Sequence, residues 1–244
     1  MDFEQLNSYS FRSLKSMAVD MGLKTHRSKQ ETINAIILAL KEYEEYKTQK
    51  VDKYTKVKQL GEKGKEGTTY LVTTTDGQEF AMKTFRKQKS SSTLRKESEL
   101  QQMASAFGIS PNVIDVDTVS KYIVMEKMDK HLIDVMKKQK GTLSKSQQQQ
   151  IIKIFKKLDQ ARVFHGDSNI LNYMYKGRKL YIIDFGMAKE VNSSLVRKLG
   201  TDTPNICIMT LGLILKLKEL KCSRTSYEYL LPYINPSERE RFKL

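Results

Sequence analysis

Three short segments in the second half of the chain restrict its fold more than any other feature. The first is His165-Gly166-Asp167. The second is the position of Asn172, five residues after Asp167. The third is Asp184-Phe185-Gly186, which directly follows the apolar run 179–183. That run predicts a buried strand that delivers Asp184 at its end. A fold compatible with this order places two polar side chains of one loop near a carboxylate at a strand end, and Asp and Asn oxygens are ligands that Mg²⁺ prefers.

The first half of the chain contains a glycine-rich segment between two predicted strands. Its glycines are Gly61, Gly64 and Gly67. Because glycine lacks a side chain, backbone N–H groups in such a loop can approach phosphate oxygens closely. Asp76-Gly77 predicts a hairpin turn, and the strand 80–83 after it ends at Lys83.

Taken in order, these motifs resemble the protein kinase superfamily over about residues 55–210. The resemblance implies an ATP- and Mg²⁺-dependent phosphotransferase. It implies that Asp167 is the catalytic base, that Asn172 and Asp184 bind metal, and that Lys83 orients the α- and β-phosphates. The glycine-rich loop departs from the usual pattern by one extra residue, so we expect a looser cover over the phosphates.

The segment 121–128 is predicted to be the strand that enters the hinge between two lobes. The resemblance implies that Met125 is the gatekeeper and that Ala81 packs on the adenine ring. It also implies that the Glu126 carbonyl and the Met128 amide bind adenine. Without the resemblance, the segment is an ordinary apolar strand.

The resemblance also implies a carboxylate partner for Lys83 on the next helix. We predict that helix over residues 92–107, with a buried face formed by Leu94, Leu100, Met103 and Phe107. Glu97 and Glu99 are both candidates. Glu97 lies nearer the centre of the buried face, so we prefer it.

Several features distinguish the chain from conventional kinases. Gly166 replaces an arginine, Asn169 replaces a lysine, and only residues 187–244 follow the third motif. We expect a helix over about 205–220, with Asn205 or Asp202 in place of its usual anchoring aspartate. In its His-Gly-Asp motif and its truncated C-terminal lobe, the chain is similar to the small atypical kinases. These are the RIO kinases, the kinase of the tRNA-modification (KEOPS) complex and minimal kinases of large DNA viruses. The expected fold is α+β and bilobed, with a truncated C-terminal lobe.

Residues 1–46 are predicted to form a separate all-α module. Ser8 or Ser10 can cap a first helix, Gly22 ends it, and Ser28 with Glu31 can cap a second. This pattern resembles SAP-like helix-extended-helix modules, which implies DNA contact through residues 11–40, with phosphate contacts from Lys15, Lys24, Arg27 and Lys29. Residues 1–50 hold eight Lys/Arg and seven Asp/Glu, a net charge close to zero, so a simple packing hairpin is an equal alternative. The other predicted segments are a linker at 47–55, an N-terminal lobe at 56–128 and a C-terminal lobe at 129–244.

The chain has 244 residues and a formal net charge of +15. Such a field attracts ATP, acidic proteins or nucleic acid. The chain's lysine-rich patches include four near Lys140, Lys156, Lys179 and Lys221. No apolar run in the sequence approaches the length of a membrane span. Cys207 and Cys222 lack the spacing of a metal site or disulfide framework, which fits a reducing intracellular compartment. Gln147–Gln150 are expected at the exposed start of a helix.

The sequence therefore predicts an atypical Ser/Thr protein kinase that acts on a protein substrate. One alternative is a small-molecule kinase, since the same His-Gly-Asp triplet occurs in aminoglycoside and choline phosphotransferases. Another alternative is an ATP-binding pseudokinase scaffold tethered to nucleic acid. The thin C-terminal lobe suggests a partner protein that covers it, and no membrane contact is expected.

Overall fold

The computed structural model describes residues 1–49, 53–61, 64 and 66–244. Its residues form two compact units. The first contains residues 1–96 and 114–125, and the second contains residues 97–113 and 126–244. The part of the predicted linker at 50–52 lies outside the described residues, as do positions 62, 63 and 65 of the glycine-rich loop.

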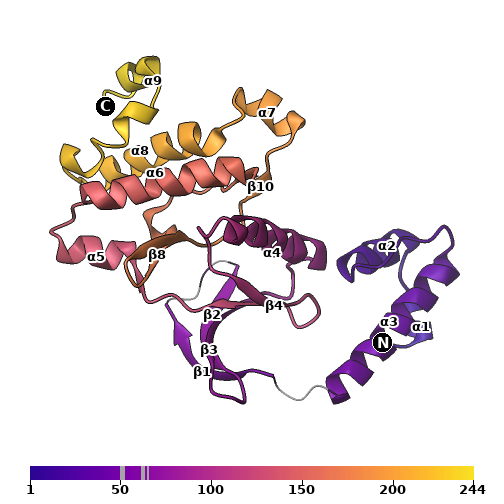
Figure 1. Ribbon diagram of the computed structural model, residues 1–244. Helices are drawn as coiled ribbons and strands as arrows, with labels where there is room; N and C mark the ends of the chain where they lie inside the picture. The colour runs from indigo at the N-terminus through magenta and orange to yellow at the C-terminus, as the bar shows by residue number, and fades with distance from the viewer. Residues whose placement is uncertain (50–52, 62–63, 65) are drawn as a thin grey trace. The chain divides into compact units, whose positions relative to one another are not determined.

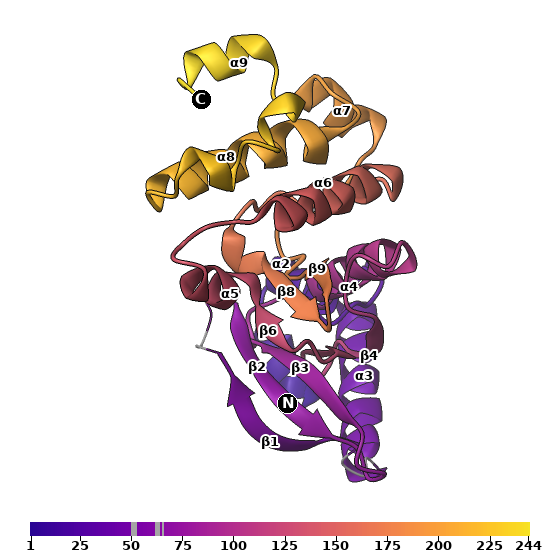
Figure 2. The same ribbon diagram turned by 60° about the vertical axis from the view of Figure 1, so that its left-hand side comes forward.

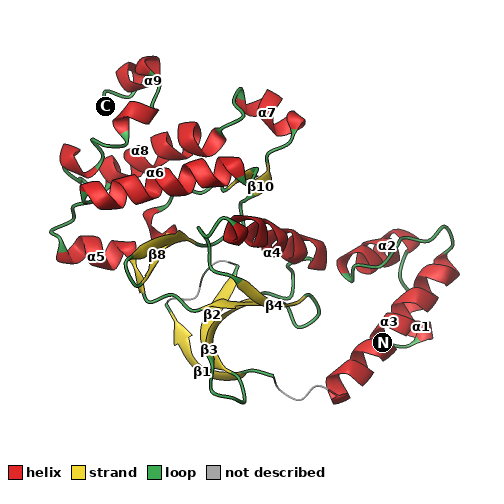
Figure 3. Ribbon diagram, in the orientation of Figure 1, coloured by secondary structure: helices red, strands yellow, loops and turns green. Residues whose placement is uncertain are grey.

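The first unit begins with helices only (Figure 3), namely α1 (Phe3–Asn7), α2 (Phe11–Asp20) and α3 (Lys29–Gln49). The Ser10 hydroxyl accepts a hydrogen bond from the Ser13 N–H at 3.1 Å, and Ser28 accepts one from Glu31 at 3.1 Å. These caps confirm the predicted starts of the two longer helices. The short helix α1, capped by Asp2, was not predicted. The apolar side chains of the three helices form their own core, made of Leu6, Leu14, Ala18, Ile33 and Ile36.

A five-stranded sheet follows the helices in the order β1-β2-β3-β5-β4 (Figure 1). The strands are β1 (Thr55–Leu60), β2 (Gly67–Thr73), β3 (Glu79–Phe85), β4 (Val113–Asp117) and β5 (Tyr122–Glu126). Strands β2 and β3 are antiparallel, and Thr69 pairs with Lys83. Their hairpin contains Gly77 at a φ of 81°, a left-handed conformation that glycine adopts without strain. The predicted hairpin and the strand that carries Lys83 are both confirmed.

Helix α4 (Ser91–Ala106) is close to the predicted range, but its buried face differs. Leu94 and Leu100 are buried as expected, whereas Met103 is 36% exposed and Phe107 is 38% exposed. The expected face was wrong because the buried stripe is partly polar. It contains Gln101, whose side-chain amide donates to the Pro111 carbonyl at 3.1 Å. An apolar pattern alone does not detect such a stripe.

The C-terminal residues of the second unit are mainly helical. Helices α6 and α8 lie side by side (Figure 2), and their apolar faces share one core with Phe155, Leu213 and Tyr173. The helices are α5 (Leu132–Lys138), α6 (Lys145–Gln160), α7 (Ser193–Leu199), α8 (Thr210–Glu219) and α9 (Pro236–Arg241). A π-helical turn, Asn205–Met209, leads into α8 and confirms the helix predicted over 205–220. The strands are β6 (Lys130–His131), β7 (Val163–Phe164), β8 (Tyr173–Lys176), β9 (Lys179–Ile182) and β10 (Lys189–Glu190).

The glutamine run at the start of α6 is not the exposed segment that we expected. Gln147 completes a capping box with Ser144, and Gln150 accepts the Leu180 N–H at 2.9 Å. Gln148 is fully buried, and its amide nitrogen donates to the carbonyls of Leu143 and Thr225, both at 2.8 Å. Its oxygen accepts the N–H of Tyr229 at 2.9 Å. The composition of the run suggested an exposed tract, but the helix turns two of its four side chains inward.

We predict that Gln148→Ala lowers the free energy of unfolding by about 2–4 kcal/mol, because it leaves buried backbone groups without partners. Urea denaturation followed by circular dichroism measures this loss. Gln149→Ala is the matched control, since Gln149 is exposed one position away. Its effect should stay within about 0.5 kcal/mol. Equal effects of the two variants would contradict the role of Gln148.

Candidate active site

The loop after β7 carries the first predicted motif, and a buried histidine holds it. The imidazole nitrogens of His165 face two carbonyl oxygens, that of Asp167 at 3.1 Å and that of Ile183 at 3.0 Å. The ring also packs edge-on against Phe185, with centroids 5.0 Å apart. Burial lowers the pKa of His165. A neutral imidazole has one N–H and so donates to one of these carbonyls at a time, and the ring lies between the loop of Asp167 and the strand end that carries Asp184.

The carboxylate of Asp167 is oriented by its own loop. Its Oδ1 accepts the Asn169 N–H at 3.0 Å, and its Oδ2 accepts the Asn172 side-chain N–H at 2.8 Å. The Asn169 side chain in turn accepts the Leu171 N–H at 3.0 Å, which caps the 3₁₀ turn Ile170–Asn172. The sequence predicted Asp167 and Asn172 as site residues, but it did not reveal the part played by the Asn169 amide. The two oxygens thus have fixed directions before any substrate arrives.

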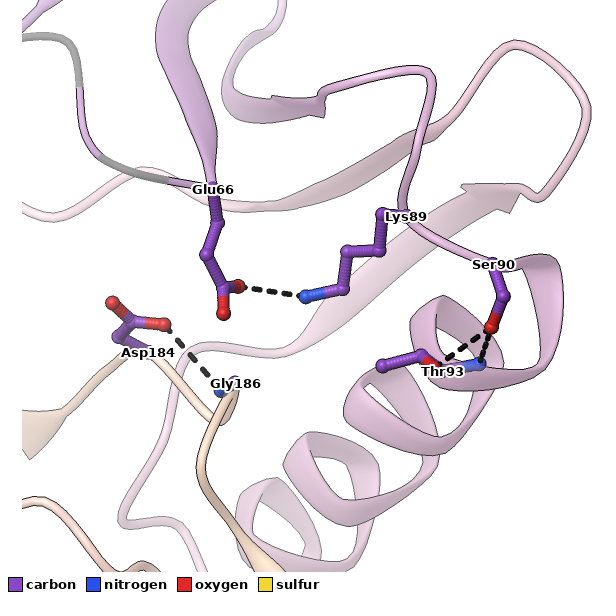
Figure 4. Close-up of polar contacts among 6 residues, drawn as sticks. All are labelled: Glu66, Lys89, Ser90, Thr93, Asp184 and Gly186. Atoms are coloured by element: carbon purple, nitrogen blue, oxygen red, sulfur yellow. Dashed lines mark hydrogen bonds and ion pairs between the residues drawn. The ribbon is translucent and has the colours of Figure 1, made fainter.

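Asp184 lies after β9, at the strand end where the sequence placed it. Its backbone has a φ of 66°, and its Oδ1 accepts the Gly186 N–H at 3.4 Å (Figure 4). Asp is among the few residues other than glycine that adopt this left-handed conformation readily. The conformation turns the chain sharply at Asp184, directly before Phe185 enters the core.

Gly166 occupies a position where a larger residue would not fit. Its φ is 78°, and a Cβ built there would lie 2.9 Å from the carbonyl oxygen of Met187. The segment after the third motif therefore passes directly over the backbone of the loop that carries Asp167. This close approach explains why the chain has glycine between His165 and Asp167.

We predict that Gly166→Ala destabilises this loop more than backbone strain alone would. Gly177→Ala is the matched control, because Gly177 also has a positive φ of 58° but nothing within 4 Å of its Cβ position. Both variants carry a left-handed penalty of about 1–2 kcal/mol. Only Gly166→Ala should add a clash and lower phosphotransfer by about tenfold or more. Thermal unfolding and phosphotransfer assays measure the difference, and equal results for both variants would contradict the packing argument.

A buried polar network anchors the loop from the other side. The Asn205 side-chain oxygen accepts the backbone N–H of His165 at 3.0 Å, and its amide nitrogen donates to Asp159 and to the Val163 carbonyl, both at 2.7 Å. Asp159, on α6, also accepts the backbone N–H groups of Asn205 and Ile206 at 2.9 and 3.0 Å. Burial raises the pKa of Asp159. Of the two candidates left open by the sequence, Asn205 takes the anchoring position, and Asp202 is exposed.

Asp159, the second-last residue of α6, was not predicted as a site residue. Gly212, on α8, is a second residue that the sequence did not reveal. A Cβ at Gly212 would lie 2.2 Å from the Ser168 hydroxyl. The residue after Asp167 therefore packs directly on α8, which explains why a helix interior contains glycine despite its low helix propensity.

The residues predicted to hold nucleotide lie partly in the first unit. Ala81 and Lys83 are two residues apart on β3, so their side chains lie on the same face of the sheet. Ala81 is buried. Gly61 lies directly after β1 at a φ of 70°, and Gly67 opens β2. Gly64 lies between them in the loop whose positions 62, 63 and 65 are outside the described residues. The roles of the three glycines stay predictions.

The hinge residues and the acidic partner of Lys83 also stay predictions. The two units separate between Met125 and Glu126, inside the predicted hinge. Met128 is buried. Glu97 is buried and Glu99 is exposed, so of the two glutamates only Glu97 has the burial expected of a lysine partner.

The donor set suits Mg²⁺ rather than a transition metal. In the described part of the chain, no group of three or more His, Cys, Asp or Glu side chains is placed to hold a metal ion. Mg²⁺ is usually bound through one or two carboxylates together with substrate phosphates and water. Asp184 supplies a carboxylate, and Asn172 keeps its side-chain oxygen available because its nitrogen donates to Asp167. These two residues fit the ion in combination with a nucleotide.

Comparison with known proteins agrees with this geometry. Residues 54–205, more than half of the chain, match the protein kinase domain. The chain belongs to the protein kinase domain family. It is also similar to the KEOPS complex subunit Bud32 of Pyrococcus abyssi (strain GE5 / Orsay), with 30% identity over 102 residues. That alignment covers 38% of this chain and 44% of the relative, so the chain spans less than half the length of this curated protein.

The matched range contains the five-stranded sheet and the segments around Asp167 and Asp184, and the match confirms the predicted superfamily and fold class. The helical module, residues 1–49, lies outside the matched range. Within the described residues, no helix is both long and apolar enough to span a bilayer.

Proposed function

We propose that the chain is an ATP- and Mg²⁺-dependent Ser/Thr protein kinase of the small atypical type. The observation that carries the proposal is the link made by His165, whose ring joins the loop of Asp167 to the end of the strand before Asp184. Phosphoryl transfer depends mainly on positioning and on electrostatic stabilisation. A rigid connection between these two carboxylates is therefore the feature that the reaction most requires.

In this mechanism, the Asp167 carboxylate accepts the proton of the attacking hydroxyl while that oxygen bonds to the γ-phosphorus and the bond to ADP breaks. The hydrogen bonds from Asn169 and Asn172 hold the carboxylate toward the acceptor. Asn172 and Asp184 would hold Mg²⁺, and the ion would supply positive charge to the phosphates. Lys83 pairs with the α- and β-phosphates, and Glu97 holds Lys83 in place.

The basic surface supports a protein substrate over a cationic small molecule. Residues 126–244 contain 23 Lys/Arg and 12 Asp/Glu. Aminoglycosides and choline are cations, and a surface of this sign repels them. Repulsion between this positive surface and cationic small molecules disfavours the small-molecule alternative. The same surface attracts acidic proteins.

The test is incubation of the purified chain with radiolabelled ATP and Mg²⁺, alone and with casein, a basic protein or an aminoglycoside panel. We expect autophosphorylation or casein phosphorylation, with mass spectrometry placing the phosphate on Ser or Thr. Labelling of an aminoglycoside alone would favour the small-molecule alternative. A nucleotide-dependent thermal shift without any transfer would favour the pseudokinase scaffold.

For the helical module we propose DNA contact through residues 11–40. Lys24 and Arg27 are exposed between α2 and α3, which supports a phosphate contact there. The other two basic candidates have protein partners, since Lys29 donates to the Asn7 carbonyl at 2.7 Å and Lys15 lies 4.4 Å from the centre of the Phe11 ring. Gel shifts of the full chain across a salt series test the contact, because phosphate-driven binding weakens steeply with salt. A Lys24→Ala/Arg27→Ala variant with unchanged binding would overturn it.

A further inference from the structure

Glu66, the residue before β2 at the end of the glycine-rich loop, is tied to the connection between β3 and α4 at two points. Its backbone carbonyl accepts the Arg86 N–H at 3.1 Å. Its carboxylate forms an ion pair with the Lys89 ammonium at 2.7 Å (Figure 4). The next residue, Gly67, abuts β3 so closely that a Cβ there would lie 1.9 Å from the Thr84 carbonyl oxygen. The end of the loop is thus fixed by its backbone and by one side chain.

The ion pair differs from an ordinary surface pair because its cation is nearly buried. The Lys89 side chain is 10% exposed, and its ammonium lies 4.4 Å from the centre of the Phe85 ring. The Lys83 ammonium lies 5.1 Å from the centre of the same ring. Both lysines therefore contact Phe85, the last residue of β3, and Lys83 is the one expected to bind phosphates. The Glu66 side chain is 48% exposed, so the pair is shielded on the lysine side only, and salt screens it less than a pair with both partners exposed.

The loop has a physical need for such a tie. Glycine loses more conformational freedom on ordering than any other residue, and this loop contains three glycines and one residue more than the usual kinase pattern. A loop that must be ordered when nucleotide binds loses affinity by that cost. A contact that holds one end in advance offsets part of the cost.

We propose that Lys89 is a nucleotide-positioning residue that acts through Glu66. It holds Glu66 beside the connection after β3, and so fixes the point at which the glycine-rich loop enters β2. The proposal rests on the proposed function, because it assigns a role in binding the nucleotide of that same reaction.

The test uses the full chain and four variants. Lys89→Met and Glu66→Gln each break the pair, Lys89→Glu/Glu66→Lys reverses it, and Lys87→Met removes a neighbouring exposed charge as the control. We measure the Kd of a fluorescent, non-hydrolysable ATP analogue in Mg²⁺. Each pair-breaking variant should raise Kd by about three- to tenfold. The reversed pair should recover most of the affinity, the control should match the wild type, and kcat should change little.

Glu66→Gln distinguishes a tie to the loop from a direct contact between Lys89 and phosphate. If Lys89 bound phosphate directly, removing the competing carboxylate would tighten binding, and that result would overturn the proposal. The Arg86 amide gives a readout without nucleotide, because it donates to Glu66. Its hydrogen exchange should be faster in both pair-breaking variants than in the control.

Unchanged exchange and unchanged Kd in both pair-breaking variants, with normal nucleotide binding by the wild type, would overturn the role of the pair alone. A wild-type chain that binds no nucleotide would instead overturn the proposed function, and the role of Lys89 with it.

Discussion

Asp167→Ala should lower the rate of phosphotransfer by about 10²- to 10⁴-fold, because it removes the carboxylate that accepts the acceptor proton. Nucleotide affinity should stay within about twofold of the wild type, since general-base function and phosphate binding reside in different side chains. Steady-state assays with labelled ATP and direct titration with the ATP analogue measure the two effects.

Two further variants define the cause of the loss. Asp167→Asn keeps the shape and one oxygen that can accept the Asn172 N–H, but it lacks the charge, so we expect it to be nearly as inactive as the alanine variant. Asp184→Ala should instead abolish the Mg²⁺ dependence of nucleotide binding. Turnover retained by purified Asp167→Ala would show that another group is the base.

The second large effect is expected from the network behind the catalytic loop. Asn205→Asp should destabilise the protein by about 3–5 kcal/mol at neutral pH, because it places a second carboxylate against Asp159 in a buried site. The side-chain nitrogen of Asn205 now lies 2.7 Å from Asp159 Oδ1, so the substitution exchanges a hydrogen bond for repulsion between like charges. Thermal and urea unfolding measure the loss.

The reversed pair Asn205→Asp/Asp159→Asn provides the decisive comparison. It restores a donor opposite an acceptor, so the double variant should be more stable than Asn205→Asp alone, although the second change is also destabilising by itself. Asn205→Ala, which removes the acceptor of the His165 N–H, should lower kcat by about 10–100-fold through misplacement of Asp167 while the affinity for nucleotide is kept. Asp202→Ala is the control and should behave as the wild type. Additive effects in the double variant would contradict the coupling of the two residues.

Most of the secondary structure could be predicted because it depends on neighbours in the sequence. Ser10 and Ser28 cap helices through bonds that span three residues, and Gly77 makes a turn through its own φ. The motifs around Asp167 and Asp184 were recognisable because the chemistry of the site requires these residue types at short, fixed spacings. The buried face of α4 could not be predicted from apolar residues, since it includes the polar Gln101 and leaves the apolar Met103 36% exposed.

The sequence by itself determined the family, the fold class and the identity of the candidate base and metal ligands. Only the tertiary structure decided how they are held, because the contacts join residues far apart in the chain. Asp159 reaches Asn205 across 46 positions, Gln148 reaches Thr225 across 77, and Glu66 reaches Lys89 across 23. Each of these polar side chains is indistinguishable from a solvated one until folding encloses it, since its partner is set by packing and not by spacing.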